Sequence, residues 1–352
     1  MKKIFSILLI FNIMLSKAQT NVVQISAETL PQNYISYFLP KTEILIEVSV
    51  KHTIQKPGRF ANYAKRLLAL NNVITSKSEK YELEKVNINY NIIPDTLKNF
   101  AVEINSKSTA YNLYLNENKI IKGVNFSNCN SNGAQLQHKI KLPTENIDTT
   151  LLFNYSVLSE DALMATSETK MAEMAAKQIF KIRESRIEIL SGESETEYKG
   201  DALQLVISEL DKIEKELVAL FEGKSITFTE TKTFRFTPKS AVEDEVIFRF
   251  SPLLGIVEKD DLAGRAISMS IFPEYINNQN SVEKKVKKFG IYYNVSQNAK
   301  TAIFDGNRQL AENNFLLPQL GTLKFLPAEL FNNKTTQVIF TEFGEIELVN
   351  SR

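Results

Sequence analysis

Residues 201–223 read DALQLVISELDKIEKELVALFEG, and their apolar positions recur at alternating spacings of three and four. That period lines the apolar side chains along one face of a helix. These side chains are Leu203, Val206, Leu210, Ile213, Leu217 and Leu220. Asp201 stands where a first-turn carboxylate faces the positive end of the helix dipole, and Gly223 stands where a left-handed residue ends a helix. The stretch therefore predicts an amphipathic helix with a buried seam.

A second helical segment, residues 167–190, comes before it. Its apolar face is wider and contains small residues, which allow a neighbouring helix to approach closely. This face comprises Met171, Met174, Ala175, Ile179, Phe180, Ile182 and Ile187. Ser191 and Gly192 end the segment, and the short turn up to Gly200 favours antiparallel neighbours. The pair predicts a helical hairpin packed inside the protein. A partner-binding coiled coil is the alternative, but it needs more heptads than this seam supplies.

Strand-like sequence lies on both sides of the helices. Residues 42–53 alternate apolar and polar side chains, and the same period of two returns over residues 225–236 and 245–250. Strands and helices do not alternate along the chain, so the pattern does not suggest a parallel nucleotide-binding sheet. We predict an α+β fold in which two β-rich domains flank a long antiparallel helical hairpin. The predicted boundaries are 19–158 for the first β-rich domain, 159–223 for the hairpin and 224–352 for the second β-rich domain.

Shorter signals divide the β-rich regions. Pro57 and Gly58 break the first strand, and the residues that follow predict a short helix from about Gly58 to Leu70. Asn116-Glu117-Asn118 predicts a hairpin, and Asp305-Gly306-Asn307 marks a turn. Further strand candidates are residues 81–91, 100–105, 110–116, 119–126, 136–142, 265–272, 288–297, 301–304, 321–326, 336–340 and 345–349.

Residues 1–18 predict a secretory signal peptide. Two lysines precede an apolar run from Ile4 to Leu15, and small residues at Ser16 and Ala18 suit cleavage before Gln19. The run is shorter than the roughly 20 residues that cross a bilayer, and no later run is apolar enough to do so. We therefore expect an exported protein, periplasmic or associated with the cell envelope, with no transmembrane span in its mature chain.

Charge and cysteine content narrow the possible partners. Without the three lysines of the predicted signal, 39 basic residues face 41 acidic ones, a net charge of about −2. A near-neutral chain with dispersed charges argues against a nucleic-acid partner. The single cysteine, Cys129, lies in an Asn-rich stretch that reads as an exposed turn. It forms no intramolecular disulfide, and the sequence offers little to activate it as a nucleophile.

The sequence contains none of the standard catalytic or ligand motifs. It has no His-Glu-x-x-His, no Gly-x-Ser-x-Gly, no phosphate-binding glycine loop and no calcium-loop spacing. The two histidines, His52 and His138, are 86 positions apart, so a histidine-rich zinc site is not expected. We interpret His52 as a surface or edge residue of a strand rather than a catalytic base. We predict no catalytic residue, cofactor or metal.

Two pairs of residues are candidate binding sites. Asp260 and Asp261 lie in a loop where they could bind a cation or act as acid and base. A turn cap beside a solvated carboxylate explains the same residues better, because neighbours in an extended segment point to opposite sides. Arg183 and Arg186 could bind a carboxylate or phosphate. We favour a structural network between the hairpin and a β domain, because glutamates in the same segment offer partners.

Several short motifs follow one another along the chain in a characteristic order. Among them are Tyr37-Phe38-Leu39-Pro40-Lys41-Thr42, Arg183-Glu184-Ser185-Arg186, Leu220-Phe221-Glu222-Gly223, Asp260-Asp261-Leu262-Ala263-Gly264 and Gly290-Ile291-Tyr292-Tyr293. In this order the chain resembles the secreted bacterial proteins grouped as domain of unknown function 4831, over nearly all of its mature length. The resemblance implies an exported envelope protein, with no established activity or catalytic residues to carry over.

Two classes of function remain open. The favoured one is a non-enzymatic envelope protein that binds another protein or a glycan through its β surfaces, which fits 12 Tyr and 22 Phe without a catalytic motif. The alternative is a metal-independent hydrolase of cell-wall or glycan material that uses carboxylates, with Asp260 and Asp261 as its best candidates. The sequence indicates no oligomeric state.

Overall fold

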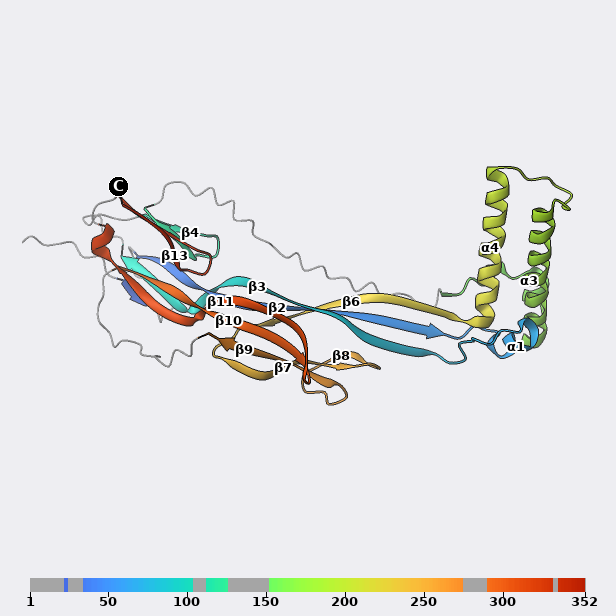
Figure 1. The fold of residues 1–352 in the computed structure, drawn as a ribbon, viewed down its shortest axis with the longest axis horizontal. Coiled ribbons are helices and arrows are strands. Elements are labelled where there is room, and N and C mark those ends of the chain that lie inside the picture. Colours follow the sequence, from blue (N-terminus) through green and yellow to red (C-terminus); the bar gives the residue numbers. More distant parts are fainter. Residues whose placement is uncertain are drawn as a thin grey trace, which may run out of the picture.

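The structure, a computed structural model, describes residues 22–24, 34–103, 112–125, 152–274, 290–331 and 335–351. The protein is elongated, with a body of β-sheets at one end and a group of helices at the other (Figure 1). The predicted signal peptide, Cys129 and His138 lie outside the described residues.

The described chain contains these elements in order. The strands are β1 (Val22–Gln24), β2 (Tyr34–Lys56), β3 (Ser78–Glu103), β4 (Leu113–Leu115), β5 (Ile121–Val124), β6 (Lys224–Phe236), β7 (Val242–Ser251), β8 (Gly255–Val257), β9 (Arg265–Pro273), β10 (Gly290–Asp305), β11 (Arg308–Pro327), β12 (Thr336–Phe340) and β13 (Ile346–Ser351). The α-helices are α1 (Ala64–Leu68), α2 (Glu160–Leu163), α3 (Glu168–Ser191) and α4 (Asp201–Glu222). Short 3-10 turns are η1 (Ala61–Tyr63), η3 (Tyr155–Val157) and η4 (Ala328–Phe331).

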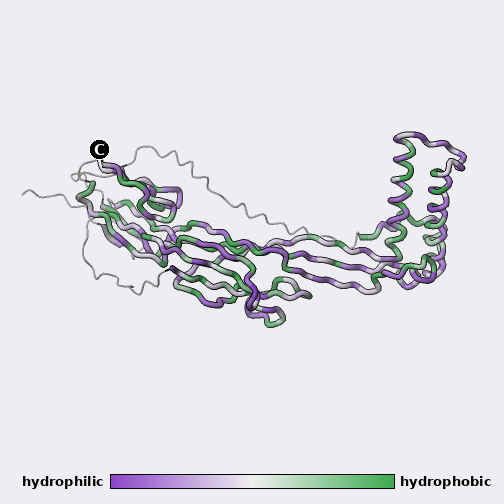
Figure 2. Tube along the Cα trace, in the orientation of Figure 1, coloured by the Kyte–Doolittle hydropathy of each residue, from purple (hydrophilic) through white to green (hydrophobic). Residues whose placement is uncertain are grey.

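The central strand of the molecule is β2. It is 23 residues long, about 75 Å at the usual rise of a strand, and it lies between β3 and β6 in an antiparallel sheet of order β1-β3-β2-β6. Hydrophilic and hydrophobic residues alternate along these strands (Figure 2). This sheet runs from the body to the helices and forms an arm between them (Figure 1).

Two core clusters meet on β2. Alternate residues from Ile44 to Val50 pack against the five-stranded sheet β11-β10-β9-β7-β8, including Phe248 and Met269. Nearer the start of β2, Tyr37 and Leu39 pack in a second cluster with the sheet β13-β12-β5-β4. A register shift between Phe38 and Leu39 accompanies this change of face. One strand therefore ties all three sheets together.

The helices form a third core at the far end of the arm. Small residues of α3, such as Ala172 and Ala175, allow close packing against Leu217 and Leu220 of α4. Phe60 and residues of α1 and α2 complete the cluster. Ser167 caps α3 by accepting a hydrogen bond from the Lys170 amide, and left-handed Gly192 ends it.

The helices join the arm without a linker. α4 ends at Gly223, and β6 begins at the next residue. The last carbonyls of α4 accept hydrogen bonds from the segment that joins β2 to β3, because Phe60 N–H donates to Leu220 O at 2.7 Å and Ile74 N–H donates to Glu222 O at 2.8 Å. A Cβ atom at Gly58 would lie 2.3 Å from the Leu220 oxygen, so only glycine permits this approach. The joint is therefore tightly packed.

The predicted fold class is wrong. The described residues are mostly antiparallel sheet, and strands from before and after the helices share sheets instead of forming two β-rich domains. β6 follows the helices in sequence, yet it pairs with β2 along the whole of β6, and β12 pairs with β5. α3 and α4 do not form a hairpin domain between two others, because their core includes the short helices at the end of the arm. The predicted boundaries near residues 158 and 223 stay predictions.

Several strands are longer than predicted. The candidates at 81–91 and 100–105 belong to one strand, β3, and those at 288–297 and 301–304 belong to β10. The predicted helix from Gly58 to Leu70 is a 3-10 turn followed by the short helix α1. The predicted hairpin is confirmed by the pairing of β4 with β5, and Gly306 lies in the turn between β10 and β11. The candidate at 136–142 lies outside the described residues.

Candidate functional site

The two halves of the α3–α4 pair differ in burial. The buried residues of α3 lie between Met171 and Ile179, and those of α4 lie between Leu217 and Phe221. These are the halves next to the arm. Beyond them, Leu203, Val206, Leu210 and Ile213 of α4 are only half-buried. We call residues 180–191 of α3 and 201–213 of α4 the distal half of the pair.

The distal half carries exposed large apolar side chains. Phe180, Ile187 and Leu190 of α3 are 50%, 65% and 65% exposed, and Leu205 of α4 is 63% exposed. Phe180 and Ile187 are seven residues apart, so they lie on one face of α3. We call this the outer face. The sequence pattern placed both residues in the packed apolar face of α3, and their exposure corrects that prediction.

The 3-10 turn η1 and the short helix α1 cover only the beginning of the outer face. Tyr63 and Thr169 share a hydrogen bond of 3.1 Å between their hydroxyls, and the Arg66 guanidinium lies 3.3 Å from the Glu173 carboxylate. From Lys177 onward, exposed residues recur along this face at spacings of three and four, at positions 177, 180, 181, 184, 187 and 188. The outer face is therefore open from about Lys177 to the end of the helix.

Arg183 and Arg186, predicted as candidate binding residues, bridge α3 to α4. The Arg183 Nε donates to Glu214 Oε1 at 2.6 Å, and Arg186 Nη1 lies 2.7 Å from Glu214 Oε2. Arg186 also contacts Asp211, and the hydrogen bond to that carboxylate raises the pKa of the arginine. The network joins the two helices, rather than a helix and a β domain, and its acidic partners come from the facing helix rather than from the same segment.

Asp260 and Asp261 lie in the loop between β8 and β9. Both are exposed. Asp261 Oδ1 accepts a hydrogen bond from the Ala263 amide at 2.9 Å, and its own amide donates to Glu258 O at 3.0 Å. Arg249 fixes the same loop by donating to the carbonyl of Lys259 at 2.7 Å. The Asp261 carboxylate therefore closes a turn, an arrangement typical of aspartate in loops.

His52 is a buried residue on the central strand, so its predicted surface or edge position is wrong. Its Nδ1 lies 3.0 Å from Glu230 Oε1 on β6, and its Nε2 lies 3.5 Å from Glu79 Oε2 on β3. Its ring stacks on Tyr81 at 4.0 Å between centroids. Burial, followed by the two nearby carboxylates, raises the pKa of Tyr81, while a hydrogen bond from Lys77, with a smaller contribution from His52, lowers the pKa of Glu79. Among the described residues, no group of three His, Cys, Asp or Glu side chains is placed to hold a metal ion.

A cavity of about 260 Å³ lies between the arm and the five-stranded sheet. Four of its five charged lining residues form two ion pairs, and the fifth is Arg308. Lys80 Nζ lies 2.8 Å from Glu82 Oε1, and Arg265 Nε lies 2.8 Å from Asp305 Oδ1. The hydrogen bond from Lys80 lowers the pKa of Glu82, whereas a general acid requires a raised one. These pairs are typical of a structural rather than a catalytic arrangement.

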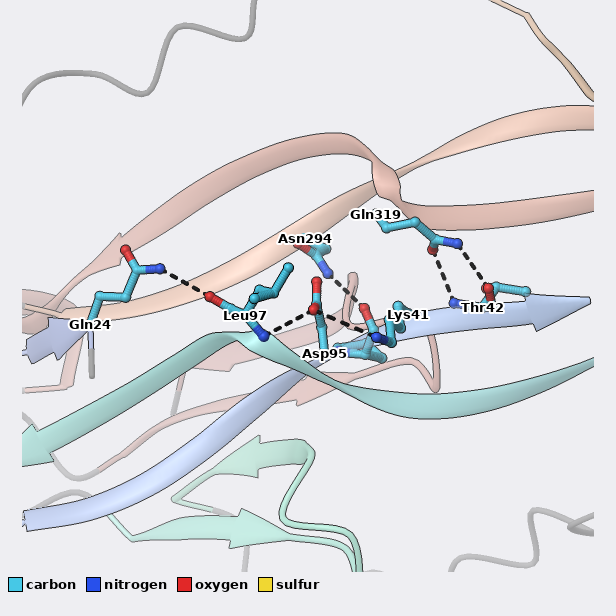
Figure 3. Close-up of polar contacts among 8 residues, drawn as sticks. Gln24, Lys41, Thr42, Asp95, Leu97, Asn294 and Gln319 are labelled. Atoms are coloured by element: carbon cyan, nitrogen blue, oxygen red, sulfur yellow. Dashed lines mark hydrogen bonds and ion pairs between the residues drawn. The ribbon is translucent and has the colours of Figure 1, made fainter. Parts of the chain in front are cut away.

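Side-chain amides continue the arm sheet where a strand ends. The pairing of β2 with β6 stops at Ile44 and Phe236. Two residues further along β2, Gln319 accepts from the Thr42 amide at 3.0 Å and donates to the Thr42 carbonyl at 2.8 Å (Figure 3). Asn294 then donates to the Pro40 carbonyl at 3.1 Å. These amides from β11 and β10 replace the missing strand and hold the body onto β2.

A bulge on β3 lies beside this junction. Leu39 pairs with Asp95 and Phe38 with Asn99, so three extra residues loop out of β3. The Asp95 carboxylate accepts from the Leu97 amide at 3.2 Å and lies 3.9 Å from Lys41 Nζ (Figure 3). Burial lowers the pKa of Lys98, and nearby Asp95 opposes that shift. The hydrogen bonds of this region therefore fix the backbone of β2 and of the β3 bulge where the arm enters the body.

The open outer face of α3 was missed by sequence reasoning. Helical periodicity groups Phe180 and Ile187 with the buried residues of the same helix, because it shows only that apolar residues recur. A usable signal was present in the charges that accompany them. Lys177, Lys181, Glu184 and Glu188 follow the same face of the helix, which marks it as lying towards solvent.

Among the described helices, none combines the length and the apolar character that crossing a bilayer requires. No curated protein and no solved structure matches this chain. The family model described as domain of unknown function (DUF4831) matches residues 33–347 of the 352 residues. This match confirms the resemblance noted in the sequence motifs, and the chain belongs to the DUF4831 family.

Proposed function

We propose that this protein is a non-enzymatic interaction protein of the cell envelope, which presents the distal half of α3 and α4 to a protein partner. Export to the envelope rests on the signal-like residues 1–18. The observation that carries the binding role is the exposure of Phe180, Ile187, Leu190 and Leu205 on this half. Single exposed apolar residues are common on protein surfaces, but several gathered on one projecting element favour an interaction site.

The connection between helices and arm supports this role. α4 runs directly into β6, and the segment that joins β2 to β3 binds the last carbonyls of α4 through Phe60 and Ile74. This helical end of the molecule, which we call the tip, is held in this way and keeps its orientation when a partner binds, which lowers the entropy lost on association. The salt-bridge network of Glu214 with Arg183 and Arg186 holds the two helices together at the start of the distal half.

The chemistry of the tip favours a protein over a glycan. Its exposed apolar residues are mostly aliphatic and lie along helices, which suits packing against another apolar helix or groove. The carboxylate-hydrolase alternative gains no comparable support, because Asp261 is engaged in closing its own loop.

Site-specific photo-crosslinking in intact cells tests the binding role. A photoreactive amino acid replaces Ile187 in the full-length protein, and the matched control replaces Leu262, which is 81% exposed on a body loop. We expect a discrete protein adduct from position 187 and none from position 262. The further change Phe180→Ser should abolish the adduct. No adduct from position 187, or equal adducts from both positions, would contradict the proposal.

Export is tested separately. Expression with the native amino terminus should give a mature protein that begins at Gln19 and fractionates with the envelope. Mass spectrometry of the intact protein reads the cleavage site. A chain that keeps residues 1–18 and stays in the cytosolic fraction would show that the predicted signal is wrong.

A further inference from the structure

We infer that the partner of the outer face is a second copy of this chain, with α3 packed antiparallel against α3 of that copy. This inference rests on the proposed function, because it names the protein that covers the same surface. It is carried by the order of charges along the face.

The charges along the outer face are self-complementary. Lys177 and Lys181 come first, Glu184 and Glu188 follow, and all four are exposed. A two-fold axis near residues 182 and 183 places Lys177 opposite Glu188 of the second copy, and Lys181 opposite Glu184. A parallel arrangement would instead place lysines against lysines and glutamates against glutamates. Charge order therefore selects the antiparallel pairing.

Within the described part of one chain these four charges form no close ion pair. Among the described residues, no ion-pair partner lies within 4.0 Å of any of the four. Lys177 and Lys181 are four residues apart, as are Glu184 and Glu188, and like charges at that spacing destabilise a helix. Glu188 also lies in the last turn, at the negative end of the helix dipole, and no basic residue accompanies it there. An antiparallel second copy brings lysines to these glutamates and relieves both effects.

The apolar residues fit the same symmetry. The axis brings Phe180 of one chain to within a turn of Ile187 of the other, on both sides of the axis. Because η1 and α1 contact the face at Thr169 and Glu173, the open contact starts near Lys177 and spans about four turns. A contact of that length is small compared with a standard interface of about 1,600 Å², so we expect a weak and reversible dimer.

A charge-swap series on the full mature chain tests the pairing. The variant K177E/K181E has a uniformly acidic face, and E184K/E188K has a uniformly basic one. Sedimentation equilibrium should show self-association of the wild type and about tenfold or greater weakening in each double variant, because every cross-chain pair becomes repulsive. Mixing the two double variants in equal amounts should restore dimers. The quadruple variant K177E/K181E/E184K/E188K should form dimers by itself, because it restores an opposite charge at every cross-chain pair.

Several results would overturn the inference. These are a wild type that stays monomeric at all accessible concentrations, double variants that associate as tightly as the wild type, or a quadruple swap that fails to restore association. Circular dichroism of each variant should match the wild type, since all four positions are exposed. An adduct from position 187 that contains a different protein would end this inference and leave the proposed function standing. Absence of any adduct would remove both.

Discussion

The proximal and distal halves of the α3–α4 pair have the same helical pattern and opposite surroundings. Next to the arm, α3 contributes five buried residues and α4 contributes four, and they pack with Phe60 and the short helices. In the distal half, apolar residues of the same kinds lie exposed or half-buried.

The difference shows that one sequence pattern serves two purposes. Apolar residues in the proximal half stabilise the fold, whereas the exposed ones in the distal half add little to stability and remain available to a partner. Substitutions that separate stability from binding therefore test this comparison directly.

The largest effect is expected in the proximal core. Phe221→Ala removes a fully buried ring and should lower the free energy of unfolding by about 3–5 kcal/mol. The matched distal change, Leu190→Ala, should alter it by no more than about 0.5 kcal/mol. Denaturant unfolding followed by circular dichroism at low protein concentration measures both. Similar losses in the two variants would show that the two halves contribute equally to stability.

The joint between helices and arm should be the next most sensitive. Gly58→Ala places a methyl group against the Leu220 carbonyl and should cost about 1–3 kcal/mol in overpacking. Gly192→Ala, at the far end of α3, has open space and suffers only from its φ of 78°, a cost of about 1 kcal/mol. Thermal unfolding compares the two. A Gly58→Ala protein as stable as wild type would mean that the joint is looser than described.

Glu214 lies at the boundary between the two halves of α4. Glu214→Gln removes the charge that two arginines share and should cost about 1 kcal/mol at low salt. Glu209→Gln breaks an exposed pair with Lys212 on the same helix and should cost about 0.3 kcal/mol. Raising the ionic strength should shrink both losses. Equal losses for the two variants would show that the bridge to α3 adds nothing beyond an ordinary surface pair.

The smallest expected effect on stability comes from Glu188→Lys, which should act in opposite directions on the stability of the monomer and on self-association. Glu188→Lys pairs with Glu184 one turn earlier and faces the negative end of the helix, so it should stabilise the monomer by about 0.5 kcal/mol. The same change should weaken self-association, because Lys177 of the second copy would then face a lysine. The melting temperature shows whether stability rises, and sedimentation of the same sample shows whether self-association weakens. A loss of stability together with unchanged association would contradict both expectations.

Local sequence signals located much of the helical structure. The spacing of apolar residues predicted both long helices, and Ser167 and Gly192 marked the ends of α3 as observed. The spacing of apolar residues alone could not show which of them are buried, and only the charges beside Phe180 and Ile187 pointed towards solvent. Phe180 is exposed because η1 and α1 contact the outer face nearer the start of α3, at Thr169 and Glu173, and that depends on where α1 stops rather than on the residues around Phe180.

The sheet arrangement could not be read in the same way. β2 and β6 pair although Ile46 and Phe234 are far apart in sequence, and alternation in either strand does not identify its neighbour. β3 looked like two strands because Pro94 and the bulge interrupt its pattern. The amides of Gln319 and Asn294 that replace a strand beside Thr42 leave no periodic signal at all.

The direct passage from α4 into β6 has a mechanical consequence. β2, β3 and β6 run along the long axis between tip and body (Figure 1). Tension applied at the helices therefore loads the hydrogen bonds between these strands in shear, all at once, rather than unzipping them one by one. A chain built this way withstands pulling between its two ends far better than peeling from the side.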